Sequence, residues 1–200
     1  MRKGDQTRAA IVSEAMAMAS VQGLEGLSIG RLATKVGMSK SGLFGHFGSK
    51  HALQLAVLEE IVARFIDEVI RPALAVRSGE ERLRTLIENW LKWDAHGVPS
   101  GGCPLTAAAN ELDAQPGPLR DYIANQQRDW LDCIQRIVGK VVKEGRFRAD
   151  LDIEQVAFEI HGIGLAHHLT AWLLGDNKAR ERALTALERV IDNARAKSIH

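Results

Sequence analysis

The residues best suited to contact another macromolecule lie in a short polar segment near the N-terminus. This segment, Ser39-Lys40-Ser41-Gly42-Leu43-Phe44, begins with the last residue of the turn Gly37-Met38-Ser39. A helix formed by it is small, polar and basic on its outer side, as suits insertion into a DNA major groove about 12 Å wide. Lys40 could then reach base edges, and Lys50 could bind phosphate. On spacing alone, a helical hairpin with a solvated face fits equally well.

Two short helices must position this segment. Apolar residues recur at one-face helical spacing over residues 29–36, and Ser28 stands before them as an N-cap. Ser49 can cap the helix that comes next, so the amides at both serines could hold phosphates. The run Gly26–Gly30 also matches the G-x-S-x-G motif of hydrolases, but no strand precedes it and an N-cap role explains Ser28. Helix, turn and helix together have the size of a helix-turn-helix.

Charge is distributed unevenly along the chain. Of its 200 residues, 26 are Lys or Arg and 25 are Asp or Glu, which gives a net charge of +1. Residues 1–51 hold seven basic and three acidic side chains, a net charge of +4, so the rest of the chain carries −3. A protein that reads DNA needs its basic excess beside the recognition helix, and an acidic remainder limits non-specific binding to DNA. The distribution therefore favours DNA binding by the N-terminal segment.

The run from Leu27 to Lys50 resembles the DNA-binding signature of TetR-family transcriptional regulators. It follows that signature almost throughout: a two-turn helix, a glycine with an apolar residue, a recognition helix, an aromatic cluster and Ser-Lys. The resemblance covers the first quarter of the chain. It implies a homodimer, a helical body that binds a small-molecule inducer, and a palindromic double-stranded DNA operator that is released when the inducer binds.

The resemblance also assigns contacts to the segment described first. Lys40 and Ser41 are implied to read bases. Gly42 is implied to let the backbone approach the DNA closely.

Phosphate contacts follow from the resemblance in the same way. Ser28, His46 and Lys50 are implied to hold phosphates. Phe44 is also counted among the DNA-contacting residues. It stands where the family often has Tyr, and because phenylalanine has no hydroxyl to donate to phosphate, a role in the hydrophobic core alone is the alternative. Gly30 weakens its helix by roughly 0.5–1 kcal/mol relative to Ala.

The rest of the sequence predicts helices from end to end, so the expected fold class is all-α with about nine helices. We find no hairpin turn and no alternation of β-branched residues. We expect a three-helix helix-turn-helix domain over residues 1–48 and a ligand-binding and dimerisation domain over 49–200. The expected helices of the second domain span residues 49–70 (a connecting helix that runs to Pro72), 80–91, 105–112, 119–143, 153–174 and 177–196, with a Gly/Pro-rich break at 97–102.

Aromatic residues and a few polar ones in the second domain are the candidate ligand-binding residues. They are Trp90, Trp93, Cys103, Tyr122, Trp130, Phe158 and His161. A pocket lined by rings with a few polar groups suits a small planar or apolar molecule. For any single tryptophan, simple core packing is the alternative, because aromatic residues at helical spacing usually pack.

The cysteines and histidines allow further chemistry. Cys103 stands at an expected helix N-terminus, where it could sense an oxidant or electrophile, although a small buried hydrophobe is the simpler interpretation. Cys133 lies within an apolar helix and is expected to be structural. His161 and His168 share a helix face, but no Cys or carboxylate completes a ligand set at short spacing, so we predict no metal and no other cofactor.

Two functions remain open at this stage. The first is a repressor that dimerises through its last two helices, where Gly162 and Gly164 would allow close approach or serve local packing. The second is an all-α small-molecule carrier or enzyme without DNA binding. We expect no catalytic residues, no membrane segment and a cytoplasmic location, because the N-terminus lacks a signal peptide and the most apolar stretch contains glutamate and histidine.

Overall fold

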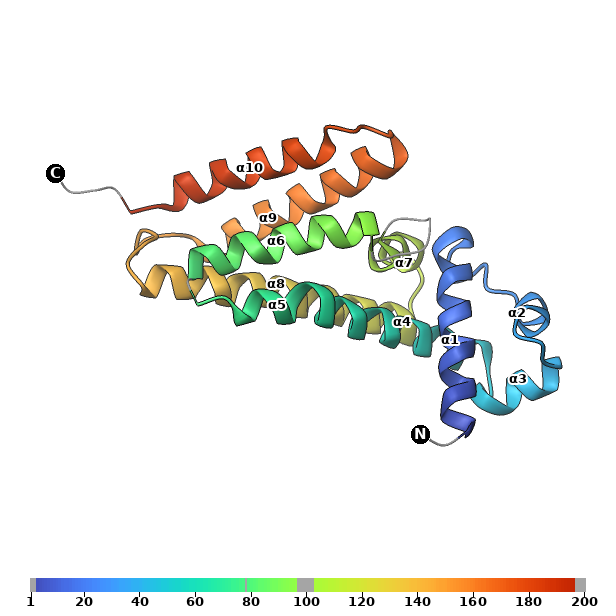
Figure 1. The fold of residues 1–200 in the computed structure, drawn as a ribbon. Helices are drawn as coiled ribbons and strands as arrows, with labels where there is room; N and C mark the ends of the chain where they lie inside the picture. The colour runs from blue at the N-terminus through green and yellow to red at the C-terminus, as the bar shows by residue number, and fades with distance from the viewer. Residues whose placement is uncertain (1–2, 78, 97–102, 197–200) are drawn as a thin grey trace. The chain divides into compact units, whose positions relative to one another are not determined.

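The computed structural model describes residues 3–77, 79–96 and 103–196, which are helical almost throughout (Figure 1). The predicted all-α fold is confirmed, since the only β interaction among these residues is an isolated antiparallel bridge between Phe147 and Arg195. The helices are α1 (Lys3–Gln22), α2 (Ile29–Lys35), α3 (Lys40–Phe47), α4 (Lys50–Phe65), η1 (Ile66–Ile70), α5 (Arg71–Ala75), α6 (Gly79–His96), α7 (Pro104–Leu112), α8 (Pro118–Lys143), α9 (Ile153–His168), η2 (Leu169–Leu173) and α10 (Ala179–Ala194).

The segments η1 and η2 are π-helical turns that continue the helices before them. Joined in this way, the described parts of the chain form nine helices, the number that the sequence predicts. The predicted break at residues 97–102 lies outside the described residues. None of the described helices is both long enough and apolar enough to cross a membrane.

The predicted end of the connecting helix is wrong. Instead of ending at Pro72, the helix continues through η1 and α5 to Ala75. Proline stands in the first turn of α5, directly after the wider π turn, where its missing N–H is not required as a donor. The helix therefore passes a residue that would interrupt a regular α-helix.

The chain packs as two compact units. One comprises residues 1–64 with 98–125, and the other comprises residues 65–97 with 126–200. This division describes packing and does not coincide with the predicted functional boundary at residue 48, which stays a prediction.

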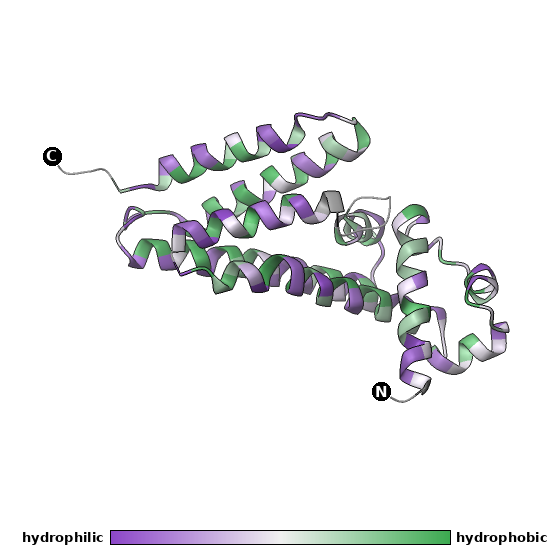
Figure 2. Ribbon diagram, in the orientation of Figure 1, coloured by the Kyte–Doolittle hydropathy of each residue, from purple (hydrophilic) through white to green (hydrophobic). Residues whose placement is uncertain are grey.

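Each unit has its own apolar core. Hydrophobic and hydrophilic residues alternate along the long helices of the second unit (Figure 2), as burial of one helix face requires. The first unit buries side chains from α1, α2, α3 and α4, among them Ile11, Ala15, Leu32, Leu43, Leu53 and Val57. In the second unit, α9 packs against both α6 and α10. Its most deeply buried side chains include Leu83, Leu86, Ile87, Ile134, Ile160 and Ile191.

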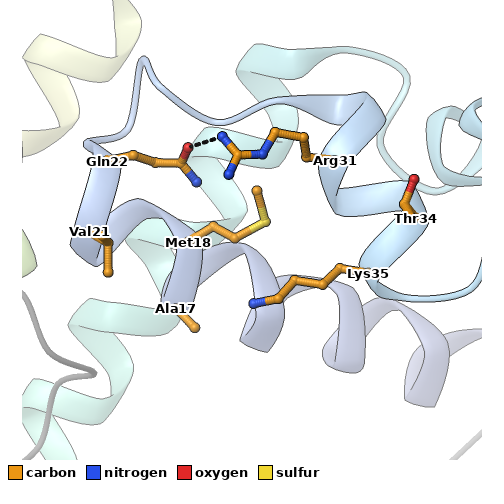
Figure 3. A pocket seen from close by; sticks show the side chains of 7 residues that line it. All are labelled: Ala17, Met18, Val21, Gln22, Arg31, Thr34 and Lys35. Carbon is orange, nitrogen blue, oxygen red and sulfur yellow. Dashed lines mark hydrogen bonds between the residues drawn. The ribbon is translucent and has the colours of Figure 1, made fainter.

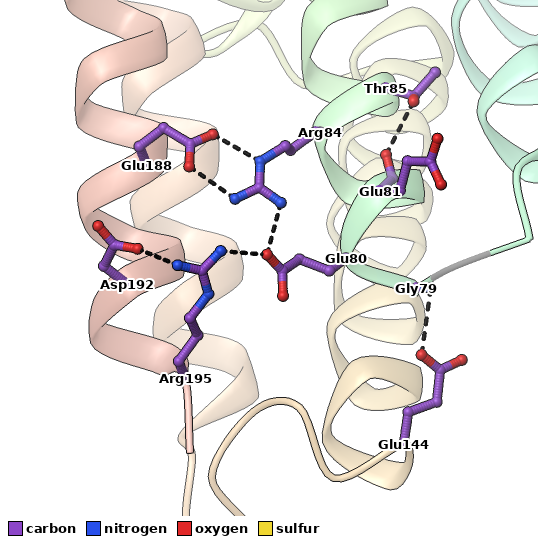
Figure 4. A network of polar contacts seen from close by, with 9 residues as sticks. All are labelled: Gly79, Glu80, Glu81, Arg84, Thr85, Glu144, Glu188, Asp192 and Arg195. Carbon is purple, nitrogen blue, oxygen red and sulfur yellow. Dashed lines mark hydrogen bonds and ion pairs between the residues drawn. The ribbon is translucent and has the colours of Figure 1, made fainter. Parts of the chain in front are cut away.

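An ion-pair network joins α6 to α10 within the second unit (Figure 4). The Arg84 guanidinium donates to both carboxylate oxygens of Glu188 at 2.7 Å, and also to Glu80 at 2.7 Å. Arg195 donates to the same Glu80 oxygen at 2.6 Å and to Asp192 at 2.6 Å. Burial acts to raise the pKa of Glu80, but the hydrogen bonds from Arg195 and Arg84 outweigh it, so the pKa is lowered. The start of α6 and the C-terminal part of α10 are thereby joined by ion pairs.

Candidate nucleic-acid interface and ligand site

The turn between α2 and α3 has a closed hydrogen-bonding pattern. Gly37 adopts a left-handed backbone conformation with φ +68°, and its N–H donates to the Thr34 carbonyl at 3.2 Å. The N–H of Met38 donates to the Ala33 carbonyl at 2.9 Å. Together these bonds form a Schellman motif, in which glycine is favoured at the left-handed position. The turn that presents α3 is thus set by its own residues.

Three serines cap the helices of this region as the sequence predicts. The side-chain oxygens of Ser28 and Ser39 each accept a backbone N–H three residues later, at 3.4 and 3.1 Å. Ser49 does the same at the start of α4, at 3.0 Å. Each cap satisfies a donor that the helix itself cannot satisfy. The hydroxyl of Ser28 therefore serves a helix between two loops, which is unlike the strand-to-helix turn of a hydrolase nucleophile.

Lys40 and Ser41 lie exposed at the start of α3. Lys40 has no ion-pair or hydrogen-bond partner among the described residues, and its aliphatic chain lies beside Gly30 of α2. A Cβ at Gly30 would be only 2.9 Å from Lys40 Cε. Gly30, which the sequence shows only as a weak helix former, therefore leaves room for the lysine that we expect to read bases.

Gly42 and Phe44 occupy different environments in α3. A Cβ at Gly42 would lie 3.2 Å from the capping hydroxyl of Ser39, so this glycine relieves crowding inside the protein as well as on any DNA face. The side chain of Phe44 is 42% exposed, so the alternative that it serves only the core is wrong, and its contact with DNA stays a prediction. Leu43, its neighbour, is fully buried and occupies that position instead. Phe44 is therefore available to a partner as an apolar ring.

Lys50 is engaged within the protein, whereas His46 only lies beside a neighbouring ring. The imidazole of His46 is half-buried and lies 6.4 Å from the ring of Phe47, over which the Arg8 guanidinium sits at 5.0 Å. Lys50 Nζ donates to the carbonyl oxygen of Glu25 at 2.5 Å and lies 3.7 Å from its carboxylate. A phosphate at Lys50 would have to share this ammonium group with Glu25.

A functional candidate that the sequence did not reveal is Glu111 on α7. Its carboxylate accepts the backbone N–H groups of Leu24 at 2.8 Å and Glu25 at 2.7 Å, in the loop between α1 and α2. Gly23, at φ +79°, makes room for it, because a Cβ there would lie 2.9 Å from Glu111 Oε1. Buried Gln54 donates to the Leu24 carbonyl from the other side, at 2.9 Å. Nothing in the sequence connects a lone glutamate to backbone groups 86 and 87 residues away.

An open groove of about 490 Å³ lies between α1 and α2 (Figure 3). Its lining residues are Ala17, Met18, Val21, Gln22, Arg31, Thr34 and Lys35. Arg31 donates to Gln22 at 3.3 Å, and Lys35 forms an ion pair with Glu14. Both cations therefore already have a partner on α1, whereas Lys40 has none among the described residues.

Four of the predicted ligand-binding residues come together in the second unit. Trp90 and Trp130 meet edge to face, with ring centroids 5.0 Å apart, and His161 stacks on Trp90 at 6.0 Å with 7° between the planes. Phe65, which is not among the predicted ligand-binding residues, contacts both Trp93 and Trp130, with ring centroids 5.1 Å apart in each pair. We call these five residues the ring cluster. Its members come from α4, α6, α8 and α9, which explains why spacing along the chain did not define the set.

Trp90 of the ring cluster packs closely against α9. A Cβ on Gly164 would lie 1.8 Å from the indole of Trp90, so the tryptophan packs directly on the helix backbone. Gly162 has open space instead, with no atom within 4 Å of such a Cβ. Of the two roles considered for these glycines, local packing therefore accounts for Gly164. Burial lowers the pKa of His161, which favours the neutral imidazole.

The other three predicted ligand residues lie elsewhere. Phe158 is 69% exposed on α9, so the structure does not bring it into the ring cluster. Cys103 is buried at the N-cap position of α7, where its side chain makes no capping hydrogen bond. Tyr122 is half-buried, and its pKa is raised by burial and by the charge of Glu59. Both belong to the first unit, whereas the ring cluster belongs to the second.

Comparison with known proteins agrees with this architecture. Residues 11–57 match the family model described as bacterial regulatory proteins of the tetR family, and residues 79–187 match the model of a tetracyclin repressor-like C-terminal domain. Comparison with curated proteins gave no match.

Solved structures provide the same comparison at the level of the fold. The chain is similar to a TetR-family transcriptional regulator from Cytophaga hutchinsonii, with 24% identity, 99% of each chain covered and a TM-score of 0.88. It is similar to a TetR transcriptional regulator from Chloroflexus aurantiacus, with 26% identity, 98% of each chain covered and a TM-score of 0.89. A third similar structure is AibR in complex with isovaleryl coenzyme A and operator DNA, with 19% identity, 92% and 96% covered and a TM-score of 0.70.

Proposed function

The chain belongs to the TetR family of transcriptional regulators, and on this premise we propose that it represses transcription from a palindromic operator until a small molecule binds. The observation that carries the proposal is the capped α2–turn–α3 unit, which leaves Lys40 and Ser41 exposed and Lys40 without an internal partner. An unpaired cation at the start of a presented helix is suited to base edges in a major groove.

We assign the contacts by residue type. Lys40 and Ser41 read base edges, and Phe44 adds an apolar contact beside them. The capped N-terminus at Ser28 and the side chains of His46 and Lys50 bind phosphates, which position the helix and carry no sequence information. Because Lys50 already pairs with Glu25, its contribution is expected to be smaller than that of an unpaired lysine.

A homodimer through α9 and α10 supplies the second recognition helix. Exposed apolar side chains follow one face of α9 and continue through η2: Phe158, Leu165, Leu169, Trp172 and Leu173. Gly162 belongs to the same open face. An apolar face of this length on a soluble helix favours self-association, and a two-fold axis would pair it with its own copy. Two recognition helices about 34 Å apart then fit successive major grooves of a palindrome.

The ring cluster is our candidate for the inducer site. Rings from four helices meet there, so a ligand among them can favour one arrangement of the helices over another. A ligand shifts the equilibrium only by its difference in affinity between the two arrangements. AibR, captured with both isovaleryl coenzyme A and operator DNA, is a neighbour of the same fold that combines a small ligand with DNA.

The experiment that tests the proposal is selection of duplexes from a random library by fluorescence anisotropy, at two salt concentrations. We expect a palindrome with half-sites one helical turn apart, bound more weakly at the higher salt. Lys40→Ala should change the preferred sequence. Lys50→Ala should weaken all duplexes alike and flatten the salt dependence. Lys92→Ala, at an exposed position of α6, is the matched control and should do neither.

The alternative is a carrier or enzyme that uses the ring cluster and never binds DNA. If no sequence is enriched at low salt, the helix-turn-helix has no recognition role, and the alternative replaces our proposal. An unchanged preference in Lys40→Ala would overturn only the assignment of base reading to that residue.

A further inference from the structure

Three ring nitrogens in the ring cluster are buried without a hydrogen-bond partner. They are Nε1 of Trp93, Nε1 of Trp130 and Nδ1 of His161. The two tryptophan side chains are 4% and 6% exposed, so bulk water does not reach them. The ring-to-ring contacts within the cluster do not satisfy an N–H donor.

Buried donors without partners are rare in folded proteins because they lose their bonds to water and gain nothing in return. A phenylalanine at position 93 or 130 would offer an apolar ring without that cost. Phe65 lies between the two indoles, 5.1 Å from each, and is such a ring. Two indoles in one cluster with their N–H groups unused therefore indicate that these donors serve something that the chain itself does not provide.

The chemistry of the three atoms restricts the partner. An indole nitrogen only donates, so two of the three positions require an acceptor lone pair. A neutral imidazole can either donate or accept, and His161 stacks face to face on Trp90, where it can continue a flat apolar surface. A charged group would be costly to bury among these apolar rings.

We propose that the ring cluster binds a neutral, flat molecule with ketone- or ester-type carbonyl oxygens, held by the indole N–H groups of Trp93 and Trp130 and by His161. This inference rests on the inducer site proposed above and defines the chemical class of its ligand. The apolar faces of the rings bind the flat skeleton, and the carbonyl oxygens accept the buried donors. A flat hydrocarbon without acceptors would leave those donors unsatisfied and would bind more weakly.

The test uses a matched pair of probes, 1-indanone and indane, which share a bicyclic skeleton and differ in one carbonyl group. Titration calorimetry should show that the wild-type protein prefers 1-indanone by roughly tenfold, the effect of one buried hydrogen bond. Trp93→Phe and Trp130→Phe keep a ring and remove the N–H, and the double variant should lose the preference. Tyr122→Phe is the control, because it also removes one donor from a ring, lies in the first unit outside the ring cluster and should leave the preference unchanged.

A second measurement does not depend on any variant. In protein labelled with ¹⁵N at its tryptophan indoles, 1-indanone should move the N–H signals of Trp93 and Trp130 downfield, while that of Trp172 stays in place. Indane should produce no such downfield shift. If the phenylalanine variants fail to fold, this experiment on the wild-type protein decides.

Equal affinities for the two probes, no binding of either at millimolar concentration, or unmoved indole signals would each overturn the proposal and leave water as the only partner of these donors. The operator selection is independent of this result. A palindrome enriched without a preference for the ketone refutes the ligand class alone. A ketone preference without any enriched duplex refutes the repressor and retains the binding site.

Discussion

The helix-turn-helix and the ring cluster differ in how the hydrogen-bonding needs of their polar groups are met. In α2 and α3, the caps at Ser28 and Ser39 and the glycine turn satisfy backbone groups within a few residues, and the side chains offered to a partner stand in solvent. In the ring cluster, the side chains are buried and come from four helices, and Trp93 and Trp130 keep unsatisfied donors. Local capping leaves side chains free to meet a large polar partner, whereas buried rings suit a small one that enters the core.

The largest expected effect comes from a substitution at the closest contact of the ring cluster. Gly164→Ala places a Cβ where Trp90 now lies, so the indole or the α9 backbone must move. We expect a loss of about 3 kcal/mol in the free energy of unfolding, as for overpacking of a well-packed core. Urea unfolding followed by circular dichroism measures it.

A control is available two residues earlier on the same helix. Gly162→Ala meets open space within the single chain, so at a protein concentration where the chain is monomeric it should gain about 0.5–1 kcal/mol through better helix propensity. If both variants have similar stability, Trp90 does not pack on the α9 backbone and the ring cluster is looser than we describe.

These two glycines illustrate how far the sequence alone reaches. It predicted the all-α fold, the caps and the turn at Gly37, because those features depend on residues three to five positions apart. It could not distinguish Gly162 from Gly164, because the difference is a tryptophan on another helix. For the same reason it omitted Phe65 and included exposed Phe158. Composition indicates that rings are present, and only packing decides which of them meet.

The next effect concerns the loop that leads into α2. Glu111→Ala removes the acceptor of two backbone N–H groups, at Leu24 and Glu25, and leaves them without a charged partner. We expect a loss of about 2 kcal/mol in unfolding free energy and weaker operator binding, because the start of the helix-turn-helix is less fixed. Thermal unfolding and fluorescence anisotropy measure the two consequences.

Glu111→Gln should lie between the wild type and Glu111→Ala, since the amide keeps one acceptor. Glu88→Ala, on an exposed face of α6, is the control and should change stability by at most about 0.5 kcal/mol. Full operator affinity in Glu111→Ala would contradict a role for α7 in holding the helix-turn-helix. The local serine caps alone would then account for its fixed geometry.

The ion-pair network of the second unit predicts a pH dependence. Glu80 is the shared acceptor of Arg84 and Arg195, and its pKa is lowered from the ordinary value of 4.5. A lowered pKa stabilises the folded state above the ordinary value, and this stabilisation is lost as the pH falls through the folded-state value. Glu80→Gln should therefore lower the free energy of unfolding at pH 7. Urea unfolding at several pH values should show the variant and the wild type converging in acid, and a constant difference would contradict the network.

The smallest expected effect comes from removing the two serine caps of the helix-turn-helix. Ser39→Ala removes a cap with a 3.1 Å hydrogen bond and should cost about 1 kcal/mol, whereas Ser28→Ala removes a longer bond of 3.4 Å and should cost about half as much. Chemical unfolding of both variants at matched concentration compares them. In Ser39→Ala, the backbone N–H of Gly42 loses its acceptor, so the first turn of α3 is less fixed. Sequence preference should then broaden more than affinity falls, because the cap orients Lys40 without itself reading a base. A Ser39→Ala protein with unchanged preference would mean that Lys40 is oriented by its contact with Gly30 alone, and that the local caps stabilise the helix-turn-helix without setting its specificity.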